Sequence, residues 1–254
     1  MPDPIVSEFT HQADTFDQAA VYRTEETLDR LVELLPLDPH DAWVDVACGT
    51  GIVSLVLAPR VASVVGLDLT PAMLARARTA AAGIANVRFV EGKAEALPFP
   101  DGHFAGAVTR FSLHHLPRPE RMVAEMARVV RPGGWVALAD HLTSGHGVAA
   151  LWHQTIERLR DPSHWACLPP DAFFAIGTAA GLELVRREEL PFHLDFADWL
   201  ARGSGGPAHR DDILALLASP PVGADAAMRV TAGRLHYRLG LGLWRRPTGD
   251  SAKE

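Results

Sequence analysis

Short apolar runs alternate with helical patterns over the first 141 residues of the chain. Residues 118–130 place their apolar side chains on one helical face, and Thr70 followed by Pro71 is typical of a helix start. The sequence "RPGG" at 131–134 predicts that the helix at 118–130 ends there and that a turn follows. Five runs have the length and composition of buried strands, at 43–47, 61–67, 87–90, 104–109 and 135–139. This alternation predicts an α/β fold with a parallel sheet and helices on both faces.

Other parts of the chain depart from this alternation. Residues 1–38 carry an amphipathic helix pattern and no strand, so we expect an N-terminal helical lid on a domain at 39–254. Two further irregular segments, at about 142–168 and 195–233, read as insertions on the substrate side. We expect all three at the carboxyl edge of the sheet, where open α/β sheets bind ligands. The remaining expected elements are helices at 170–180 and 213–217, a strand at 182–190, and a last strand in "LHYRLGLGLWRR".

Composition and charge narrow the class of protein. The chain has 254 residues, of which 48% are apolar and 22% charged, as in an ordinary globular protein. A net charge of -7 argues against nucleic acid as a partner, and no apolar stretch approaches the roughly 20 residues of a membrane span. Two cysteines and an N-terminus without a signal-peptide pattern favour a reducing, cytoplasmic location. Both a monomer and a homodimer remain open.

The stretch "VDVACGTG" at 44–51 ends a strand with two glycines. Gly49 and Gly51 permit a sharp turn into a helix and a close approach of a ligand to the backbone. Asp68, about 20 residues further on, is spaced to bind ribose hydroxyls. The third glycine of a dinucleotide motif is Ser54, and Asp45 inside the strand would repel a pyrophosphate. The turn therefore suits a ribose-containing ligand that bears an amino group or a sulfonium.

Five motifs in consecutive order resemble those of a known family. They are "VDVACGTG", "VVGLDLTPAML", "EGKAEALPF", "TRFSLHHL" and "EMARVVRPGGWVALAD", and they cover roughly residues 43–141. Together they resemble the class I S-adenosylmethionine-dependent methyltransferases, and are most similar to the branch of the ubiquinone and menaquinone biosynthesis enzymes. The resemblance implies a Rossmann-like, mostly parallel seven-stranded sheet with an antiparallel last strand. It also implies methyl transfer from S-adenosyl-L-methionine to a small-molecule acceptor, with S-adenosyl-L-homocysteine as product.

The resemblance also implies residue roles along the cofactor. Asp45 would bind the methionine amino group, and Asp68 would accept from both ribose hydroxyls. The other implied positions are the backbone at the methionine end (Ala47, Cys48, Gly49 and Gly51), the adenine sandwich (Leu69 and Met73), the adenine edge (Ala94 and Glu95), the floor below the sulfonium (Arg110 and Phe111) and the cofactor carboxylate (Tyr22).

Lys93 departs from the family pattern. The usual residue at this position is an aspartate that accepts from the adenine amino group, and lysine has no acceptor. Either Lys93 turns to solvent and the backbone near Ala94 still binds adenine, or cofactor binding is weakened or lost. The second alternative would fit a methyltransferase fold repurposed for another reaction.

The sequence "SLHHL" offers candidate catalytic residues on the acceptor side. His114 and His115 follow the fourth strand, and histidine has a suitable pKa for a general base. The alternative is that both are structural hydrogen-bonding groups. Asp140 and His141, at the end of the fifth strand, could contact the acceptor or serve only the turn.

Aromatic residues in the lid and the first insertion predict the nature of the acceptor. Phe9 and Phe16 suit a lid over the acceptor, and Trp152 lies in the insertion where the family binds substrates. An aromatic pocket favours an apolar or aromatic small molecule. The alternative is that the lid aromatics only pack on the sheet.

The sequence predicts no metal site, because His153, His164 and Cys167 lack the spacing of zinc ligands. Two other functions remain beside methyl transfer. One is a non-methylating reaction on the same fold, such as cyclisation or decarboxylation, and the other is a non-catalytic binding module. The sequence leaves open which acceptor is used and whether oxygen, nitrogen or carbon is methylated.

Overall fold

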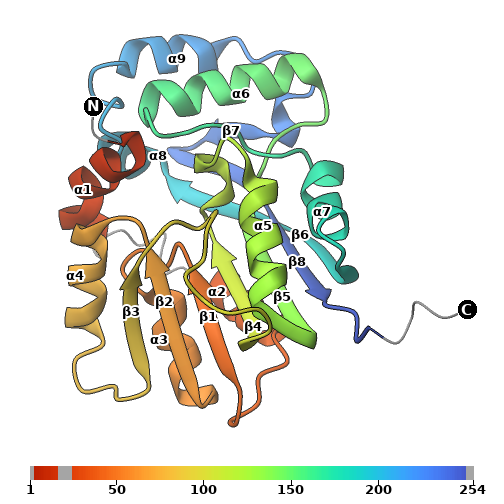
Figure 1. The fold of residues 1–254 in the computed structure, drawn as a ribbon. Coiled ribbons are helices and arrows are strands. Elements are labelled where there is room, and N and C mark those ends of the chain that lie inside the picture. The colour runs from red at the N-terminus through yellow and green to blue at the C-terminus, as the bar shows by residue number, and fades with distance from the viewer. Residues whose placement is uncertain (1–2, 17–24, 250–254) are drawn as a thin grey trace, which may run out of the picture.

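A computed structural model describes residues 3–16 and 25–249 of the chain. One twisted sheet runs through the molecule in the order β3-β2-β1-β4-β5-β8-β6, and β7 pairs with β8 beside this path (Figure 1). All five strands expected in the first 141 residues are present. The strands are β1 (Ala42–Val46), β2 (Ser63–Asp68), β3 (Val87–Glu91), β4 (Phe104–Arg110), β5 (Val130–Leu142), β6 (Glu183–Asp195), β7 (Met228–Thr231) and β8 (Arg234–Arg245).

The direction of the strands confirms the expected fold class. Strands β1 to β5 pair in parallel, and β8 lies antiparallel between β5 and β6. The expected sheet of seven strands gains β7 as an eighth, inside the predicted insertion at 195–233. It forms a tight hairpin with β8 through Ala232 and Gly233, which both have positive φ, at 51° and 74°.

Helices cover both faces of the sheet. Figure 1 shows α5 (Pro119–Val129) and α7 (Pro170–Ala179) in front of it, and α2 (Glu25–Leu34) and α3 (Ile52–Leu57) behind. Each pair contributes to a separate buried cluster, as expected for a covered parallel sheet. Helix α4 (Pro71–Ala80) lies at the β3 edge.

The remaining helices gather above the carboxyl ends of the parallel strands (Figure 1). This cap consists of α1 (Pro4–Phe16), α6 (Gly147–Arg160), α8 (Phe196–Arg202) and α9 (Arg210–Ala218). Three short 3-10 turns complete the described elements, namely η2 (Ala58–Arg60), η3 (Leu113–His115) and η4 (Ala224–Ala226). No helix within 3–16 and 25–249 has both the length and the apolar character needed to cross a bilayer.

Local chemistry explains two helix boundaries. Helix α4 begins at Pro71 as expected, but the Thr70 hydroxyl makes no capping bond; the Thr70 backbone N–H donates to the carboxylate of Asp68. Helix α5 ends at Val129, just before "RPGG", as predicted. The turn predicted at 131–134 is absent, because strand β5 starts at Val130 and runs through these residues, with Gly133 at φ 78°.

The predicted lid at 1–38 divides into two parts with different packing. The expectation that the whole segment lies outside the core was wrong for α2. Its apolar side chains belong to the main core, and Arg30 forms an ion pair with Glu188 of β6 at 2.5 Å. Only α1 lies over the carboxyl edge, so the domain boundary expected at residue 38 is not a boundary of packing. The predicted positions Tyr22 and the Phe16 side chain fall outside the described residues.

Candidate functional site

A cavity of about 510 Å³ lies between the carboxyl edge of the sheet and the cap. It extends from the glycine turn after β1 to the histidines after β4 and β5. Most residues predicted to bind the cofactor line it: Asp45, Ala47, Cys48, Gly49, Asp68, Leu69, Lys93, Ala94, Glu95, Arg110 and Phe111. Four residues predicted on the acceptor side line it too, namely Phe9, His114, His115 and His141.

Asp45 lies buried at the floor of the glycine turn. Its Oδ2 accepts from the backbone N–H of Ser54 at 2.9 Å and from the Ser54 hydroxyl at 2.6 Å. Both bonds end on one oxygen, which leaves the other for a ligand. Burial raises the pKa of Asp45 to about 7, against the lowering effect of the Ser54 bonds. The serine that replaces the third glycine of a dinucleotide motif therefore holds this carboxyl group.

Asp68 and two threonines form the next part of the wall. The Asp68 carboxylate accepts from the backbone N–H groups of Gly49 and Thr70, each at 2.8 Å, and burial raises its pKa. The hydroxyl of Thr50 is buried without a hydrogen-bond partner in the described part of the chain, although Thr50 lines the cavity. A buried hydroxyl of this kind calls for a ligand or water, so the wall fits a polar, ribose-containing cofactor.

Backbone conformations at the strand ends are unusual. Ala47 and Phe111 have φ of 56° and 57°, in the left-handed region that non-glycine residues seldom adopt. The Phe111 ring lies 4.4 Å from the Arg110 guanidinium, and Arg110 also donates to the Thr27 hydroxyl at 3.1 Å. Gly51 has φ 84°, and a Cβ there would lie 2.8 Å from the Phe89 ring. Gly51 thus serves packing beneath the turn and does not itself line the cavity.

At the adenine end of the cavity, only some of the predicted residues line the wall. Ala94 and Glu95 are half-buried at the cavity wall, while Lys93 is exposed at its rim. The Lys93 carbonyl accepts from the Ala96 N–H at 3.1 Å and keeps this turn closed. Met73 of α4 is fully buried and does not line the cavity, so only Leu69 of the predicted adenine sandwich faces it.

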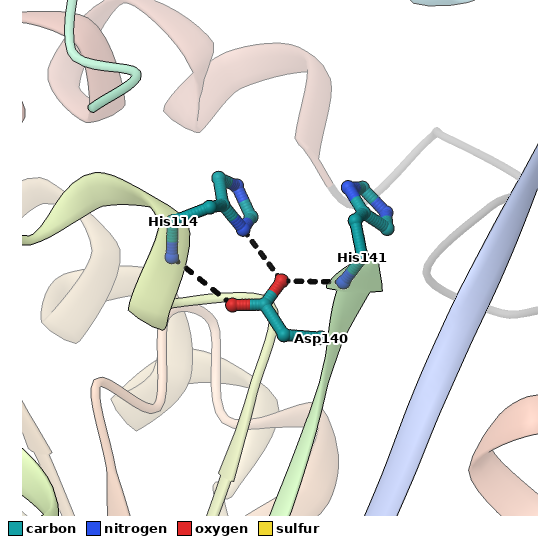
Figure 2. Close-up of side chains that lie close together, drawn as sticks. All are labelled: His114, Asp140 and His141. Carbon is teal, nitrogen blue, oxygen red and sulfur yellow. Dashed lines mark hydrogen bonds and ion pairs between the residues drawn. The ribbon is translucent and has the colours of Figure 1, made fainter. Parts of the chain in front are cut away.

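A hydrogen-bonded Asp–His pair lies at the acceptor end (Figure 2). Nδ1 of His114 is 2.5 Å from Oδ1 of Asp140, whose carboxylate also accepts from the backbone N–H groups of His114 and His141, at 3.1 and 2.7 Å. Asp140 is only 2% exposed and does not line the cavity. Its predicted contact with the acceptor is therefore replaced by a contact with His114.

The four groups of this cluster have divergent pKa values. Burial favours the neutral form of all of them, but the charge and hydrogen bond of the His114–Asp140 pair override it. They bring the pKa of Asp140 down to about 2 and raise that of His114. Burial, reinforced by the charge of His114, lowers the pKa of His115 to about 4 and that of His141 to about 3. His114 is thus the histidine of the cluster that carries a proton most readily.

Ligand atoms of His114, Asp140 and His141 lie within 4.8 Å of one another, and these residue types bind metals. The Asp140 carboxylate, however, already accepts from three N–H groups of the two histidines. We therefore assign these side chains to a hydrogen-bonded pair and its neighbour. The expected absence of a metal stays a prediction.

The loop after α6 adds residues that sequence reasoning missed. Oδ1 of Asp161 accepts from the Ser163 hydroxyl at 2.6 Å, and Oγ of Ser163 lies 3.0 Å from Nδ1 of His115. The available signal was "DPS" at a helix end, because aspartate often bonds the backbone two residues on, as the 2.9 Å bond from the Ser163 N–H shows. Trp165 lines the cavity and is 53% exposed.

Two predicted aromatic contacts have different outcomes. Phe9 of α1 lies against His115, with ring centroids 4.8 Å apart in an edge-to-face arrangement. Trp152 does not line the cavity, because α6 turns it into the core, where its Nε1 donates to the Leu216 carbonyl at 2.9 Å. Its predicted contact with the substrate was wrong.

Comparisons with known proteins agree with this geometry. Residues 44–138 match the family described as "Methyltransferase domain". The uncharacterized methyltransferase YcgJ of Bacillus subtilis is 31% identical over 80% of this chain and 81% of the relative. The chain belongs to the methyltransferase family.

Other similar proteins support the same assignment. The crystal structure of YcgJ superimposes with a TM-score of 0.80, at 26% identity, over 89% of this chain and all of that chain. A Bacillus halodurans protein, provisionally named a methyltransferase, gives 0.81 at 28% identity over 88% of this chain and 100% of its own. A demethylmenaquinone methyltransferase of Desulfitobacterium hafniense is 38% identical over 44% of this chain and 46% of the enzyme. The predicted family, fold class and enzyme class of this S-adenosylmethionine-dependent methyltransferase are confirmed.

Proposed function

We propose that this methyltransferase binds S-adenosyl-L-methionine through Asp45 and Asp68 and methylates a small, apolar or aromatic molecule beside His114 and His115. One observation carries the proposal: a single cavity joins the two buried carboxyl groups at the glycine turn to the histidine cluster. The two carboxyl groups can bind the amino group and the ribose hydroxyls of the cofactor. The histidine end of the cavity can hold the nucleophile of the acceptor.

The cofactor, when bound, supplies a methyl group that is already activated by the sulfonium. The protein then has to orient the acceptor and exclude water. Helix α1 covers the acceptor end through Phe9, and apolar walls come from Phe111, Trp165 and Trp199. These walls support an aromatic acceptor.

Binding measurements test the cofactor part of the proposal. We expect Asp68→Ala to weaken S-adenosylmethionine binding at least tenfold in calorimetry, because each hydrogen bond to a charged group contributes about 1.5–3 kcal/mol. Asp171→Ala is the matched control, since Asp171 is exposed on α7, does not line the cavity and should leave affinity unchanged. Equal affinity of the folded Asp68 variant and the wild type would remove Asp68 from the site.

An assay for S-adenosylhomocysteine release with candidate acceptors tests the transfer itself. Release that depends on an acceptor supports methylation. Cofactor binding without release from any acceptor would favour a non-methylating reaction or a binding module on the same fold.

A further inference from the structure

The loop at 161–166 is fastened onto η3 at the acceptor end of the cavity. Two backbone N–H groups of this loop donate to the carbonyl oxygen of His114, at 2.8 and 3.1 Å. The Ser163 side chain is thereby held against His115, which lies 48 positions earlier in the chain. An inserted loop thus adds its own polar groups to the histidine cluster.

The direction of the hydrogen bonds defines the tautomer of His115. The Ser163 hydroxyl has one proton and donates it to Oδ1 of Asp161 at 2.6 Å. Oδ2 of Asp161 faces two further donors, Nε2 of Gln12 at 3.4 Å and Nη1 of Arg160 at 3.3 Å, as expected for a carboxylate that only accepts. Oγ of Ser163 must then accept from His115, whose Nδ1 carries the hydrogen. The lone pair of the neutral ring is left at Nε2.

In the neutral His114 ring the lone pair is also at Nε2, but for a different reason. Its Nδ1 donates to Asp140, and Figure 2 shows the other ring nitrogen turned away from that carboxylate. The centroids of the His114 and His115 rings are 4.2 Å apart, and both residues line the cavity. Since Nδ1 of each ring acts as the donor in these bonds, the two neighbouring Nε2 atoms are the ones left to meet an acceptor molecule in the cavity.

We propose, resting on the methyl transfer proposed above, that the acceptor is an aromatic compound with hydroxyls on two adjacent carbons. His114 takes the proton of the hydroxyl that is methylated, and His115 accepts a hydrogen bond from the other. Ser163 and Asp161 are positioning residues, because they act only through the tautomer of His115.

The proton and the electron pairs balance as follows. The hydroxyl proton moves to Nε2 of His114, and the oxygen pair forms the new bond to the methyl carbon. The pair of the broken carbon–sulfur bond stays on sulfur and neutralises the sulfonium. The proton remains on the imidazolium of His114, which Asp140 stabilises, until it passes to solvent. An amine would need no proton removal before attack, so this arrangement favours a hydroxyl.

The groups around His114 and His115 keep the role of His114 as base separate from the role of His115 as hydrogen-bond acceptor. The groups that face His114 and His115 are Asp140, Glu157, Asp161, His141 and His164. Neighbouring groups whose pKa values are pushed apart mark an acid–base division of labour. The raised pKa of His114 makes it the stronger base, and the lowered pKa of His115 keeps that ring a neutral acceptor.

Nitrogen-15 NMR of the histidine rings tests the tautomer without any acceptor or cofactor. We expect His115 to be neutral with hydrogen on Nδ1 from pH 5.5 to 8, and His114 to titrate above the ordinary histidine value. Ser163→Ala should give His115 a mixture of both neutral tautomers, and Ser163→Thr, which keeps the hydroxyl, should restore the wild-type signal. A wild-type His115 with hydrogen on Nε2 would overturn the proposal.

Turnover of matched probes tests the acceptor class. We expect kcat/KM for 2,3-dihydroxynaphthalene to exceed that for 2-naphthol at least tenfold, and 2-naphthylamine to give no product. In Ser163→Ala the preference for the diol should fall, mainly through KM, because only part of the protein then keeps a bare Nε2 on His115. Ser163→Thr should recover the preference.

The outcomes separate this inference from the proposed function. Equal turnover of the diol and 2-naphthol, faster turnover of the amine, or turnover of none of the probes by a protein that binds S-adenosylmethionine would overturn the acceptor class alone. Failure of the folded wild type to bind S-adenosylmethionine in calorimetry would instead overturn the proposed function.

Discussion

Asp45 is the residue whose chemistry most directly links the apo protein to its cofactor. It is buried, its pKa is raised to about 7, and one carboxylate oxygen is engaged by Ser54. An ammonium group on the cofactor would favour the ionised form. Asp45 is thus a carboxyl group that is half-protonated near neutrality and that a cationic ligand would ionise.

We expect S-adenosylmethionine affinity to rise with pH up to about 7 and then level off. Below that pH the cofactor must displace a proton from Asp45, which costs close to a tenfold loss of affinity per pH unit. Calorimetry between pH 5.5 and 8 measures the trend. Asp45→Asn should bind weakly at every pH, and a wild-type affinity independent of pH would exclude Asp45 from the contact.

We also expect Asp45→Asn to stabilise the free protein at high pH. The folded pKa of about 7 lies above the ordinary value of 3.8, so the folded state binds the extra proton and wild-type stability falls as pH rises between these values. Asparagine has no such term and can still accept from Ser54. Its free energy of unfolding should gain about 2–3 kcal/mol over wild type between pH 5 and pH 8. Urea unfolding at both pH values decides this, and a constant difference would contradict it.

Lys93 is the position where one substitution should improve the cofactor site. Its side chain is exposed at the cavity rim and offers no acceptor to adenine. Lys93→Asp should tighten S-adenosylmethionine binding by about 0.5–1.5 kcal/mol, the net value of one hydrogen bond. Arg88→Asp makes the same charge change on exposed β3 and controls for long-range electrostatics. Unchanged or weaker binding of Lys93→Asp would show that a carboxylate at this position does not accept from the adenine amino group.

At the scale of elements, α1 and α2 differ although the sequence groups them together. Helix α2 buries Leu28 and Leu31 in the core. Helix α1 is held by polar contacts along its middle, where Glu8 accepts from the backbone N–H of Ser204 at 3.0 Å and Gln12 reaches Asp161. The polar nature of these contacts makes α1 the part of the segment suited to open and close over the cavity.

We expect the amides of α1 to exchange with solvent faster than those of α2, and to slow when S-adenosylhomocysteine binds. Residues of α1 line the cavity, so a ligand there should add contacts to this helix. Hydrogen exchange followed by mass spectrometry measures both helices in one experiment. Glu8→Ala should speed exchange in α1 and leave α2 unchanged. Equal protection of α1 with and without ligand would refute the lid.

The predictability of each element followed the strength of its local pattern. Five strands and α5 carry continuous apolar or helical periodicity, and the sequence placed them within a few residues. Strand β7 and helix α8 have four and seven residues in polar surroundings, which is too short for a periodic signal. Their stability comes from pairing with β8 and from core contacts, which only the fold supplies.

The orientation of side chains in the site could be predicted from the sequence only in part. The order of motifs was sufficient to gather Asp45, Asp68 and His114 at one edge, because parallel strands end on the same side. It did not show which side chains turn inward. Asp140 lies behind His114, and Trp152 faces α9, since helix rotation and packing decide these orientations.

At the scale of the whole molecule, the cap and the sheet share one core. The main buried cluster contains Trp43 of β1 and Val108 of β4 together with Trp152 of α6, Trp199 of α8 and Ile213 of α9. Strand β8 is part of the central sheet, and its first residues pair with β7. The insertions are therefore built into the domain, and α1 is the one described cap helix that we expect to act as a cover.

This shared core predicts that cap and sheet unfold together. Ile213→Ala removes a fully buried side chain from the cap and should lower the free energy of unfolding of the whole protein by about 2–5 kcal/mol. Urea unfolding should show one transition, with the same midpoint by circular dichroism and by tryptophan fluorescence. Val222→Ala, also in the cap but 91% exposed, should leave the midpoint unchanged. Two separate transitions, with only the first moved by Ile213→Ala, would show instead that the cap is an independent unit, and cofactor binding would then have to order it before the acceptor site could form.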